Sequence, residues 1–181
     1  TIYREAQRSA NITNNLLSFA RKHHSEKQLI SINEAIEKTL ELRTHQMKVN
    51  KIELLVQLQP DLPMTVADYY QMQQVFMNII INAEQAMLEA HGEGRLLVTT
   101  MAEGNTIRIA FTDDGPGISE KNLTKIFDPF FTTKEAGSGT GLGLSICYGV
   151  VQNHGGRIYA ISKLGQGATF IVEIPIISDG S

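Results

Sequence analysis

The chain has 181 residues, 42% of them hydrophobic, and a formal net charge of −3, a length that suits one domain of about 100 to 150 residues plus an appendage. The sequence lacks the clustered basic excess of nucleic-acid-binding proteins, no apolar run reaches the roughly 18 residues that span a bilayer, and a single cysteine excludes an internal disulfide. We therefore expect a cytoplasmic domain. Because the sequence begins within a helical pattern, we expect a fragment of a longer protein.

The first stretch, residues 1–24, repeats apolar or small side chains with the period of a helix. One helix cannot bury its own apolar stripe, so this helix needs a partner helix. A capping box formed by Ser31 and Glu34 predicts a second helix over about 32–49, and apolar–polar alternation predicts a strand over 52–58. We divide the chain into a helical segment at 1–27, a domain at 28–175 and a tail at 176–181.

A long helix is predicted over about 68–91. Its core face is apolar: Met72, Val75, Phe76, Ile79, Ala83, Ala86 and Met87. A stripe beside that face consists wholly of amides: Gln71, Gln74, Asn78, Asn82 and Gln85. An exposed helix face normally includes Lys and Glu, so the uncharged row indicates partial burial against a polar partner; a solvated stripe is the alternative. Asn82 offers an amide oxygen that suits Mg²⁺, an ion that takes few protein ligands.

Two strands, over 95–102 and 106–112, are predicted with a hairpin turn at 103–105. The second strand runs into the sequence DDGPGI at 113–118. An acid at the end of a buried strand, followed by glycines that allow a tight turn, would place the Asp113 carboxylate at the floor of a pocket. There it can accept a hydrogen bond from an exocyclic amine such as that of adenine. The alternative is a surface turn, for which this sequence is also well suited.

A short helix is predicted over 119–126 with Ser119 as its N-cap, followed by the aromatic segment FDPFFTTK at 127–134. Aromatic residues in a loop usually anchor it, so the polar and glycine-rich remainder at 132–141 is predicted to open and close as a lid. Lys134 is the only cation of the sequence close to the glycines that follow.

Glycine occupies every second position in GSGTGLGL at 137–144, which leads into an apolar helix that ends near His154 and contains Cys147 as a core residue. Free N–H groups of a glycine loop and of a helix N-terminus bind anions, phosphate above all; a plain hinge is the alternative. The loop is neither a P-loop, which needs Lys after its last glycine, nor a dinucleotide fingerprint, which needs glycine at Leu142. A last hairpin is predicted over 157–163 and 168–175.

The order of these motifs resembles that of a known family. Four motifs within 68–175 resemble the N, G1, F and G2 boxes of the sensor histidine kinases: NxxxN at Asn78 and Asn82, DxGxG at 113–117, FDPFF at 127–131 and GTGLGLS at 139–145. These kinases belong to the GHKL group of ATP-binding proteins, with DNA gyrase, the mismatch-repair ATPases and a heat-shock chaperone. The resemblance implies an α+β fold, the Bergerat two-layer sandwich, in which helices cover one face of a mixed sheet. It also implies that 1–27 is the second helix of a dimerisation and phosphoacceptor hairpin.

The resemblance implies a role for each motif in binding ATP and Mg²⁺. Asp113 would bond the adenine amino group, Gly117 would give the base room, Asn82 would hold the metal and Asn78 would lie by the phosphates. The implied nucleotide site comprises Asn78, Asn82, Asp113, Gly115, Gly117, Ile118, Lys134, Gly139, Thr140, Gly141, Leu142 and Gly143. Family members often carry a basic residue where this chain has Gln85. Lys134 therefore becomes the candidate for the charge at the terminal phosphate, with Asn78 and Lys134 acting in catalysis.

The implied function is that of a sensor histidine kinase catalytic domain, which transfers the terminal phosphoryl group of ATP to a histidine for relay to a response regulator receiver domain. None of the five histidines has the sequence context of a phosphoacceptor: His23, His24, His45, His91 and His154. The acceptor is therefore expected upstream of Thr1, on the hairpin of the same or the neighbouring subunit of a homodimer. A membrane anchor, where the full-length protein has one, is also expected upstream.

Transfer is expected in preference to hydrolysis. The related hydrolases activate water with a Glu whose position corresponds to Asn78, and an amide cannot take a proton from water at neutral pH. Glu84 is displaced from that face of the helix and is a poor substitute. Two alternatives stay open: a Ser-directed protein kinase of the same fold, against which the N-terminal helix argues, and a nucleotide-gated interaction module without phosphoryl transfer.

Overall fold

The computed structural model describes residues 26–134 and 139–177. The predicted N-terminal helix at 1–24 lies outside these residues, as do four positions of the predicted lid, 135–138, and the end of the predicted tail, 178–181. These three predictions therefore stay predictions. Within the described ranges, no helix is long and apolar enough to cross a membrane.

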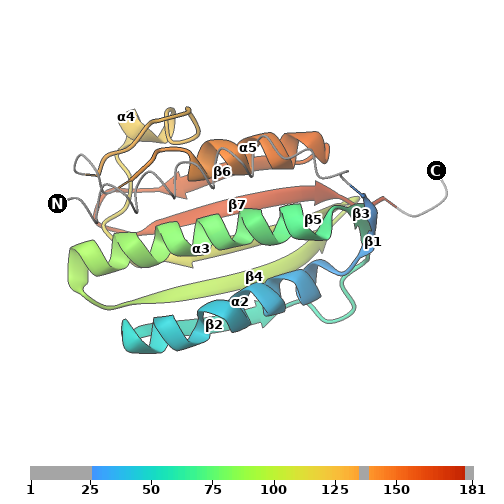
Figure 1. The fold of residues 1–181 in the computed structure, drawn as a ribbon, viewed down its shortest axis with the longest axis horizontal. Coiled ribbons are helices and arrows are strands. Elements are labelled where there is room, and N and C mark those ends of the chain that lie inside the picture. Colours follow the sequence, from blue (N-terminus) through green and yellow to red (C-terminus); the bar gives the residue numbers. More distant parts are fainter. Residues whose placement is uncertain (1–25, 135–138, 178–181) are drawn as a thin grey trace, which may run out of the picture.

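The fold is built on a five-stranded sheet in the order β2-β4-β5-β7-β6 (Figure 1). The strands are β2 (Ile52–Leu58), β4 (Gly94–Glu103), β5 (Thr106–Asp113), β6 (Arg157–Ser162) and β7 (Ala168–Pro175). β2 runs parallel to β4, and the other neighbours are antiparallel, so the sheet is mixed. Each strand agrees with its predicted range to within one residue at either end.

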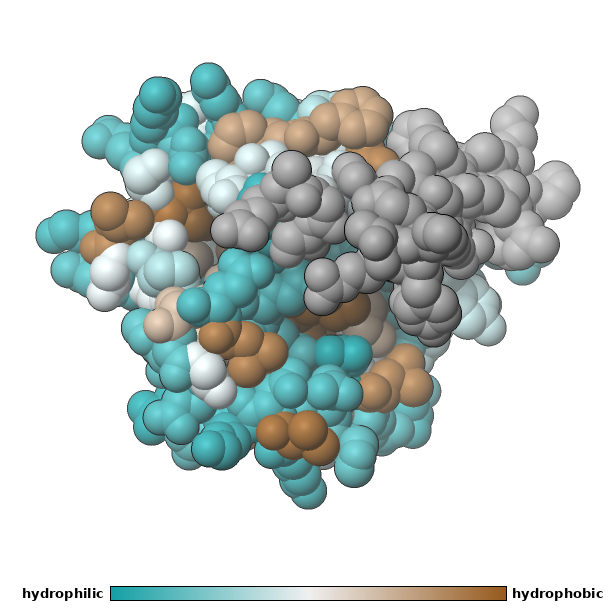
Figure 2. All heavy atoms as spheres, turned by 60° about the vertical axis from the view of Figure 1, so that its left-hand side comes forward, coloured by the Kyte–Doolittle hydropathy of each residue, from teal (hydrophilic) through white to brown (hydrophobic). Residues whose placement is uncertain are grey.

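Three helices lie on the same side of this sheet: α2 (Ile32–Val49), α3 (Tyr69–His91) and α5 (Gly143–Asn153) (Figure 1). The core lies between the two layers, where Phe76 of α3 packs against Phe111 of β5 with ring centroids 5.8 Å apart. This arrangement confirms the predicted two-layer α+β sandwich. On the face in Figure 2, hydrophilic side chains predominate and hydrophobic ones form separate patches.

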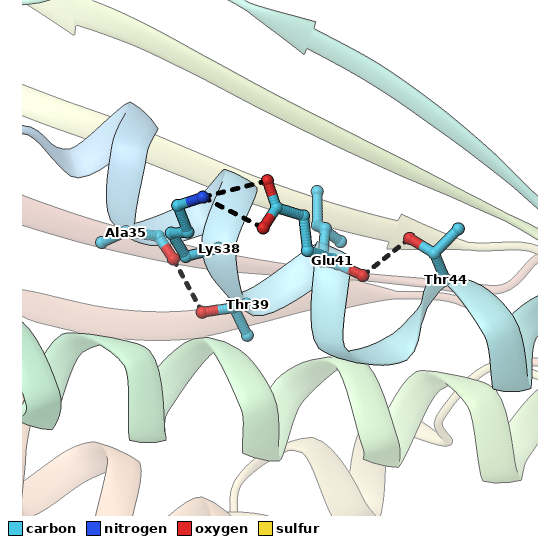
Figure 3. Close-up of polar contacts among 6 residues, drawn as sticks. Ala35, Lys38, Thr39, Glu41 and Thr44 are labelled. Carbon is cyan, nitrogen blue, oxygen red and sulfur yellow. Dashed lines mark hydrogen bonds and ion pairs between the residues drawn. The ribbon is translucent and has the colours of Figure 1, made fainter.

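Each of the two longest helices begins with a capping side chain, and the cap of α2 is the one that the sequence predicts. Ser31 is the N-cap of α2, and its hydroxyl accepts a hydrogen bond from the Glu34 N–H at 3.2 Å. Asp68 caps α3 in the same way, accepting from the Gln71 N–H at 3.0 Å. Inside α2, the buried Thr39 hydroxyl donates to the Ala35 carbonyl at 2.7 Å on the side that faces α3 (Figure 3). Its burial therefore leaves no unpaired polar group.

The α3 core face is buried as predicted, except that Ala86 is half-buried. Two predictions were wrong in extent. The helix predicted over 119–126 is only α4 (Glu120–Leu123): Ser119 is its N-cap but its side chain makes no capping hydrogen bond, and turns follow. In α5 only Cys147 and Val151 are buried, so this helix is less enclosed than its apolar sequence predicts.

Two short strands were not predicted. β1 (Gln28–Ile30) and β3 (Thr65–Ala67) pair antiparallel as a separate small sheet. Each is three residues long, too short for an alternating pattern to register in the sequence. The pair nevertheless has a structural consequence, because β3 leads directly into Asp68 and so fixes where α3 begins.

Candidate nucleotide site

The Asp113 carboxylate lies at the end of β5 and is only 4% exposed. Its Oδ1 accepts hydrogen bonds from the Gly115 N–H at 2.9 Å and the Ala168 N–H at 3.3 Å. Burial raises the pKa of Asp113, and these two hydrogen bonds oppose the rise. No group in the described part of the chain hydrogen-bonds to Oδ2, so this oxygen is available to accept from a ligand.

Glycines are required around Asp113 because backbones approach closely there. Gly117 has φ +73°, and a Cβ on it would lie 2.2 Å from the Lys163 carbonyl oxygen. Gly167 has φ +74°, and a Cβ on it would lie 2.0 Å from the Asp113 carbonyl oxygen. The turn after β5 is therefore pressed against the β6–β7 turn, where only glycine fits.

The β6–β7 hairpin also holds Ile118. The Ile118 N–H donates to the Ser162 hydroxyl at 2.8 Å, and that hydroxyl donates to the Gly167 carbonyl at 2.6 Å. Sequence reasoning missed Ser162, as it missed the Ala168 N–H bound to Asp113. A backbone donor leaves no signature in residue type, and a serine near a turn is too common to single out.

The amide row of α3 is partly buried, as predicted. Gln85 is exposed, and the other four members are half-buried: Gln71, Gln74, Asn78 and Asn82. The Asn78 amide donates to the Gly143 carbonyl at 3.3 Å, which joins α3 to the first residue of α5. The Asn82 amide makes no hydrogen bond to any residue that the structure describes, so its oxygen is free for a ligand.

The glycine loop leads into α5 as predicted. α5 has Leu142 as its N-cap and no side chain bonded there, so its first-turn N–H groups have no intrahelical acceptor and attract an anion. Thr140 Oγ1 accepts from the Leu142 N–H at 3.4 Å. Gly141 has φ +65°, and a Cβ on it would lie 2.4 Å from the carbonyl carbon of Phe130.

The aromatic segment at 127–134 is hydrogen-bonded to the glycine loop through backbone groups. The Phe130 N–H donates to the Gly141 carbonyl at 2.9 Å, and Phe130 itself has φ +65°, which is rare outside glycine. The aromatic anchor that the sequence predicts is therefore partly a backbone contact, because the Phe130 side chain is 72% exposed. Phe127 and Phe131 provide the packing, half-buried against the core.

Lys134 lies against α3. Its ammonium donates a hydrogen bond to the Gln85 side-chain oxygen, and its backbone N–H donates to Thr132 Oγ1 at 3.2 Å. A Cβ on Gly139 would lie 3.4 Å from Lys134 Cδ, so the glycine loop passes directly beside the lysine stem. Lys134 thus meets the very position, Gln85, at which the sequence lacks a basic residue.

The four motifs meet at α3. Gly115 approaches the Ala86 backbone, where an added Cβ would lie 3.5 Å from the Ala86 carbonyl carbon. Asn78 contacts Gly143, and Gln85 contacts Lys134. The structure thus brings a buried carboxylate, a glycine loop at a helix N-terminus, the Asn82 amide and a lysine to one helix. These are the groups that a magnesium-bound nucleoside triphosphate requires.

Glu84 is committed elsewhere. It is 2% exposed, and Arg43 of α2 donates to it from Nε to Oε1 at 3.0 Å and from Nη2 to Oε2 at 2.5 Å. A buried ion pair between α2 and α3 could not be predicted from the sequence, because Arg43 and Glu84 are far apart along the chain. Because both carboxylate oxygens are bound, Glu84 does not serve the face that carries Asn78.

Comparison with known proteins gives one family. Residues 67–178 match the model of the family described as histidine kinase-, DNA gyrase B-, and HSP90-like ATPase. The chain is 34% identical over 173 residues to the sensor histidine kinase ZraS of Escherichia coli K12, covering 96% of this chain and 36% of ZraS. It is 38% identical over 166 residues to the signal transduction histidine-protein kinase AtoS of the same strain, covering 92% and 27%. The chain thus spans about a third of these relatives or less.

Solved structures of histidine kinases have a similar fold. The nucleotide-free catalytic domain of the histidine kinase ThkA superposes with a TM-score of 0.74 at 34% identity, covering 84% of this chain and 97% of that domain. Full-length ShkA in complex with AMPPNP gives a TM-score of 0.83 at 26% identity, covering 98% and 38%. ThkA in complex with the response regulator protein TrrA gives 0.78 at 28% identity, covering 96% and 49%.

Proposed function

Since this chain belongs to the histidine kinase-, DNA gyrase B-, and HSP90-like ATPase family and contains the catalytic ATP-binding domain of a sensor histidine kinase, we propose that it binds Mg-ATP beside α3 and transfers the terminal phosphoryl group to a histidine. The observation that carries this proposal is the contact between Asn78 and Gly143, which joins the amide row to the glycine loop. A phosphate chain beside that contact meets donors from both elements.

Asp113 selects the base in this proposal. Its free Oδ2 accepts a hydrogen bond from the adenine amino group, while Oδ1 is held by the Gly115 and Ala168 N–H groups. A carboxylate fixed by two backbone donors does not need to reorganise when the base arrives. Gly117 and Ile118 border the same turn, held there by the β6–β7 hairpin.

The phosphates lie at the N-terminus of α5, where the N–H groups of Gly139, Gly141 and Gly143 can reach them. Asn82 fits a Mg²⁺ ion, because its amide oxygen is unengaged among the described residues and no cluster of three or more His, Cys, Asp or Glu competes in that part of the chain. When bound, the ion would neutralise charge on the phosphate oxygens. Lys134 supplies a further positive charge at the terminal phosphate.

Transfer is favoured over hydrolysis because neither of the two candidate positions on α3 offers a base to water. Asn78 carries an amide, and Glu84 is held by Arg43. The terminal phosphoryl group therefore awaits an acceptor imidazole in line with the leaving oxygen. We place that histidine on a dimerisation hairpin, of which residues 1–27 form the second helix, and the next acceptor on a response regulator; the complex of ThkA with TrrA supports the second step.

In the test, this chain receives ATP labelled on the terminal phosphate and a separately produced hairpin that bears the acceptor histidine. The proposal expects label on the hairpin, lost in acid and stable in base, as phosphohistidine is. Acid-stable label would favour a Ser-directed kinase of the same fold. ATP binding without any label would favour a nucleotide-gated interaction module.

A further inference from the structure

The contact between Gln85 and Lys134 joins two segments that are 49 residues apart. Lys134 is held at three points: its backbone N–H donates to Thr132 Oγ1, its stem lies beside Gly139, and its ammonium donates to the Gln85 oxygen. Gln85 lies on α3 one turn after Asn82, in the same stripe as Asn78. The contact therefore fixes a cation beside the amide row.

The Gln85 oxygen that accepts the hydrogen bond from Lys134 is neutral, and this determines how much charge the lysine keeps. A lysine ammonium has three donors and no acceptor, and an amide oxygen satisfies one donor without cancelling the charge. Lys134 is half-buried, and burial lowers its pKa while the Glu89 carboxylate, one turn beyond Gln85, opposes that effect. A partly desolvated cation that keeps its charge interacts more strongly with an incoming anion than an exposed one does.

We propose that Gln85 is a specificity-determining positioning residue, which holds the Lys134 ammonium at the amide row of α3, one turn from Asn82, so that the site prefers a nucleoside triphosphate over a diphosphate. This inference rests on the nucleotide site proposed above, but not on phosphoryl transfer. A triphosphate brings one more phosphate than a diphosphate, and Lys134 is the cation placed to meet it. Weak retention of the diphosphate would also ease release of the product.

A purely structural contact predicts something different. If Gln85 only fastened residues 132–134 to α3, a change at Gln85 would alter thermal stability or affect both nucleotides alike. If Gln85 holds the Lys134 ammonium in place for the phosphate, a carboxylate at position 85 forms an ion pair with that ammonium and lowers affinity for the triphosphate selectively. Exchanging the two side chains would return a cation to the same contact.

The experiment measures dissociation constants of Mg-ATP and Mg-ADP by titration calorimetry, with thermal unfolding alongside. The variants are Lys134→Gln, Gln85→Glu and the exchange variant Gln85→Lys with Lys134→Gln. Gln57→Glu and Gln57→Lys, at an exposed position on β2, make the same charge changes away from Lys134. We expect Lys134→Gln and Gln85→Glu each to weaken ATP binding about tenfold, the size of a charged hydrogen bond, with ADP affinity unchanged.

The exchange variant is expected to recover most of the ATP affinity that Lys134→Gln loses, and the Gln57 variants to match wild type. The inference is overturned if Gln85→Glu keeps the wild-type ratio of ATP to ADP affinity, if both affinities fall together, or if the exchange variant recovers nothing. A wild-type domain that shows this pattern yet never labels a histidine would leave the inference standing and reject the proposed kinase activity.

Discussion

The side-chain amide of Asn78 donates a hydrogen bond to the carbonyl of Gly143 at 3.3 Å. These residues come from two helices, and each belongs to a motif with its own predicted role. Their contact places the first turn of α5 beside the amide row of α3. In the proposed site, the phosphates and the metal would therefore bind at a single junction, and we expect changes on either helix to alter nucleotide affinity.

Asp113→Asn should abolish measurable adenine nucleotide binding. The amide replaces the free Oδ2 with a donor that faces the adenine amino group, and the charge-assisted hydrogen bond is lost. Calorimetry with ATP should show a loss of about a hundredfold or more, in keeping with a hydrogen bond to a charged group together with an unpaired donor. Asp114→Asn is the control, since Asp114 is exposed and accepts from the Arg95 N–H; near-normal affinity of Asp113→Asn would reject the adenine assignment.

The same substitution should raise the stability of the empty domain. The pKa of Asp113 is raised by burial, so the folded state binds its proton more tightly than the unfolded state. The resulting stability is present at low pH and is lost as pH rises through the folded pKa. At neutral pH the wild type has a buried, ionised carboxylate at position 113, and Asp113→Asn does not. Without nucleotide, the variant should therefore unfold at a higher temperature than the wild type. A lower unfolding temperature would contradict the view that burial of the Asp113 charge costs stability.

Asn82→Ala should change the magnesium requirement. Loss of the amide oxygen removes the proposed protein ligand, so more Mg²⁺ should be needed for half-maximal ATP binding. Affinity for ATP without metal should change much less. Asn153→Ala serves as the control, because Asn153 is exposed at the C-terminal end of α5, away from the glycine loop. If the magnesium titrations of Asn82→Ala and wild type coincide, Asn82 is not a metal ligand.

Lys134→Ala should reduce phosphoryl transfer more than it reduces ATP binding. Charge at the terminal phosphate grows in importance as the phosphoryl group leaves, so the lysine contributes more in the transition state than in the bound state. Single-turnover labelling of the separate hairpin should slow by about a hundredfold or more, against a loss of about tenfold in affinity. Equal losses in both measurements would show that Lys134 only binds.

Glu84→Gln should destabilise the domain without changing its chemistry. The Arg43–Glu84 pair joins α2 to α3, and Arg43 is 26% exposed, so the cost should be about 2 kcal/mol, below that of a fully buried pair. Glu41→Gln, in an exposed pair with Lys38, should cost almost nothing. Denaturant unfolding measures both. A fall in residual ATP hydrolysis of the refolded Glu84→Gln domain would instead mark Glu84 as a base.

His154 should make stability depend on pH. Its Nε2 accepts from the Asp68 N–H at 3.0 Å, and Nδ1 lies 2.8 Å from the Val150 carbonyl, so the neutral ring fits both partners. Burial and the nearby Lys27 lower the pKa of His154, while the Val150 carbonyl and Asp68 oppose this. A lowered folded pKa gives stability that is present above about pH 6.5, the ordinary histidine value, and is lost as pH falls through the folded pKa.

His154→Gln should flatten that pH dependence, because glutamine can still bond both partners but does not titrate. Urea unfolding at several pH values between 5 and 8 measures how the free energy of unfolding depends on pH. An equal slope in wild type and variant would assign the acid sensitivity to other groups.

Much of the fold could be predicted because its signals are local. The alternation at 52–58 and the capping box of Ser31 with Glu34 depend on neighbours in sequence, and the structure follows them. The strands β1 and β3 depend on pairing between residues at least 35 positions apart in sequence and are too short to show a period. α4 stops early because the residues after Leu123 adopt turns.

In the candidate site, too, the local features could be predicted from the sequence and the contacts between distant residues could not. Glycines and amides could be named from motif order, but not what each contacts. Gly117 and Gly167 are explained by backbone approaches that no spacing rule reveals, and the positive φ of Phe130 has no sequence signal. The contact of Lys134 with Gln85 needs the tertiary structure, although the missing basic residue at position 85 directs attention to it.

A crystal structure of this chain with Mg²⁺ and a non-hydrolysable ATP analogue would test the proposed nucleotide site without intermediate steps. We predict the adenine amino group on Asp113 Oδ2, the metal on the Asn82 oxygen, and the phosphates on the N–H groups that begin α5. Nucleotide bound at any other place, or an empty site at millimolar analogue, would contradict it.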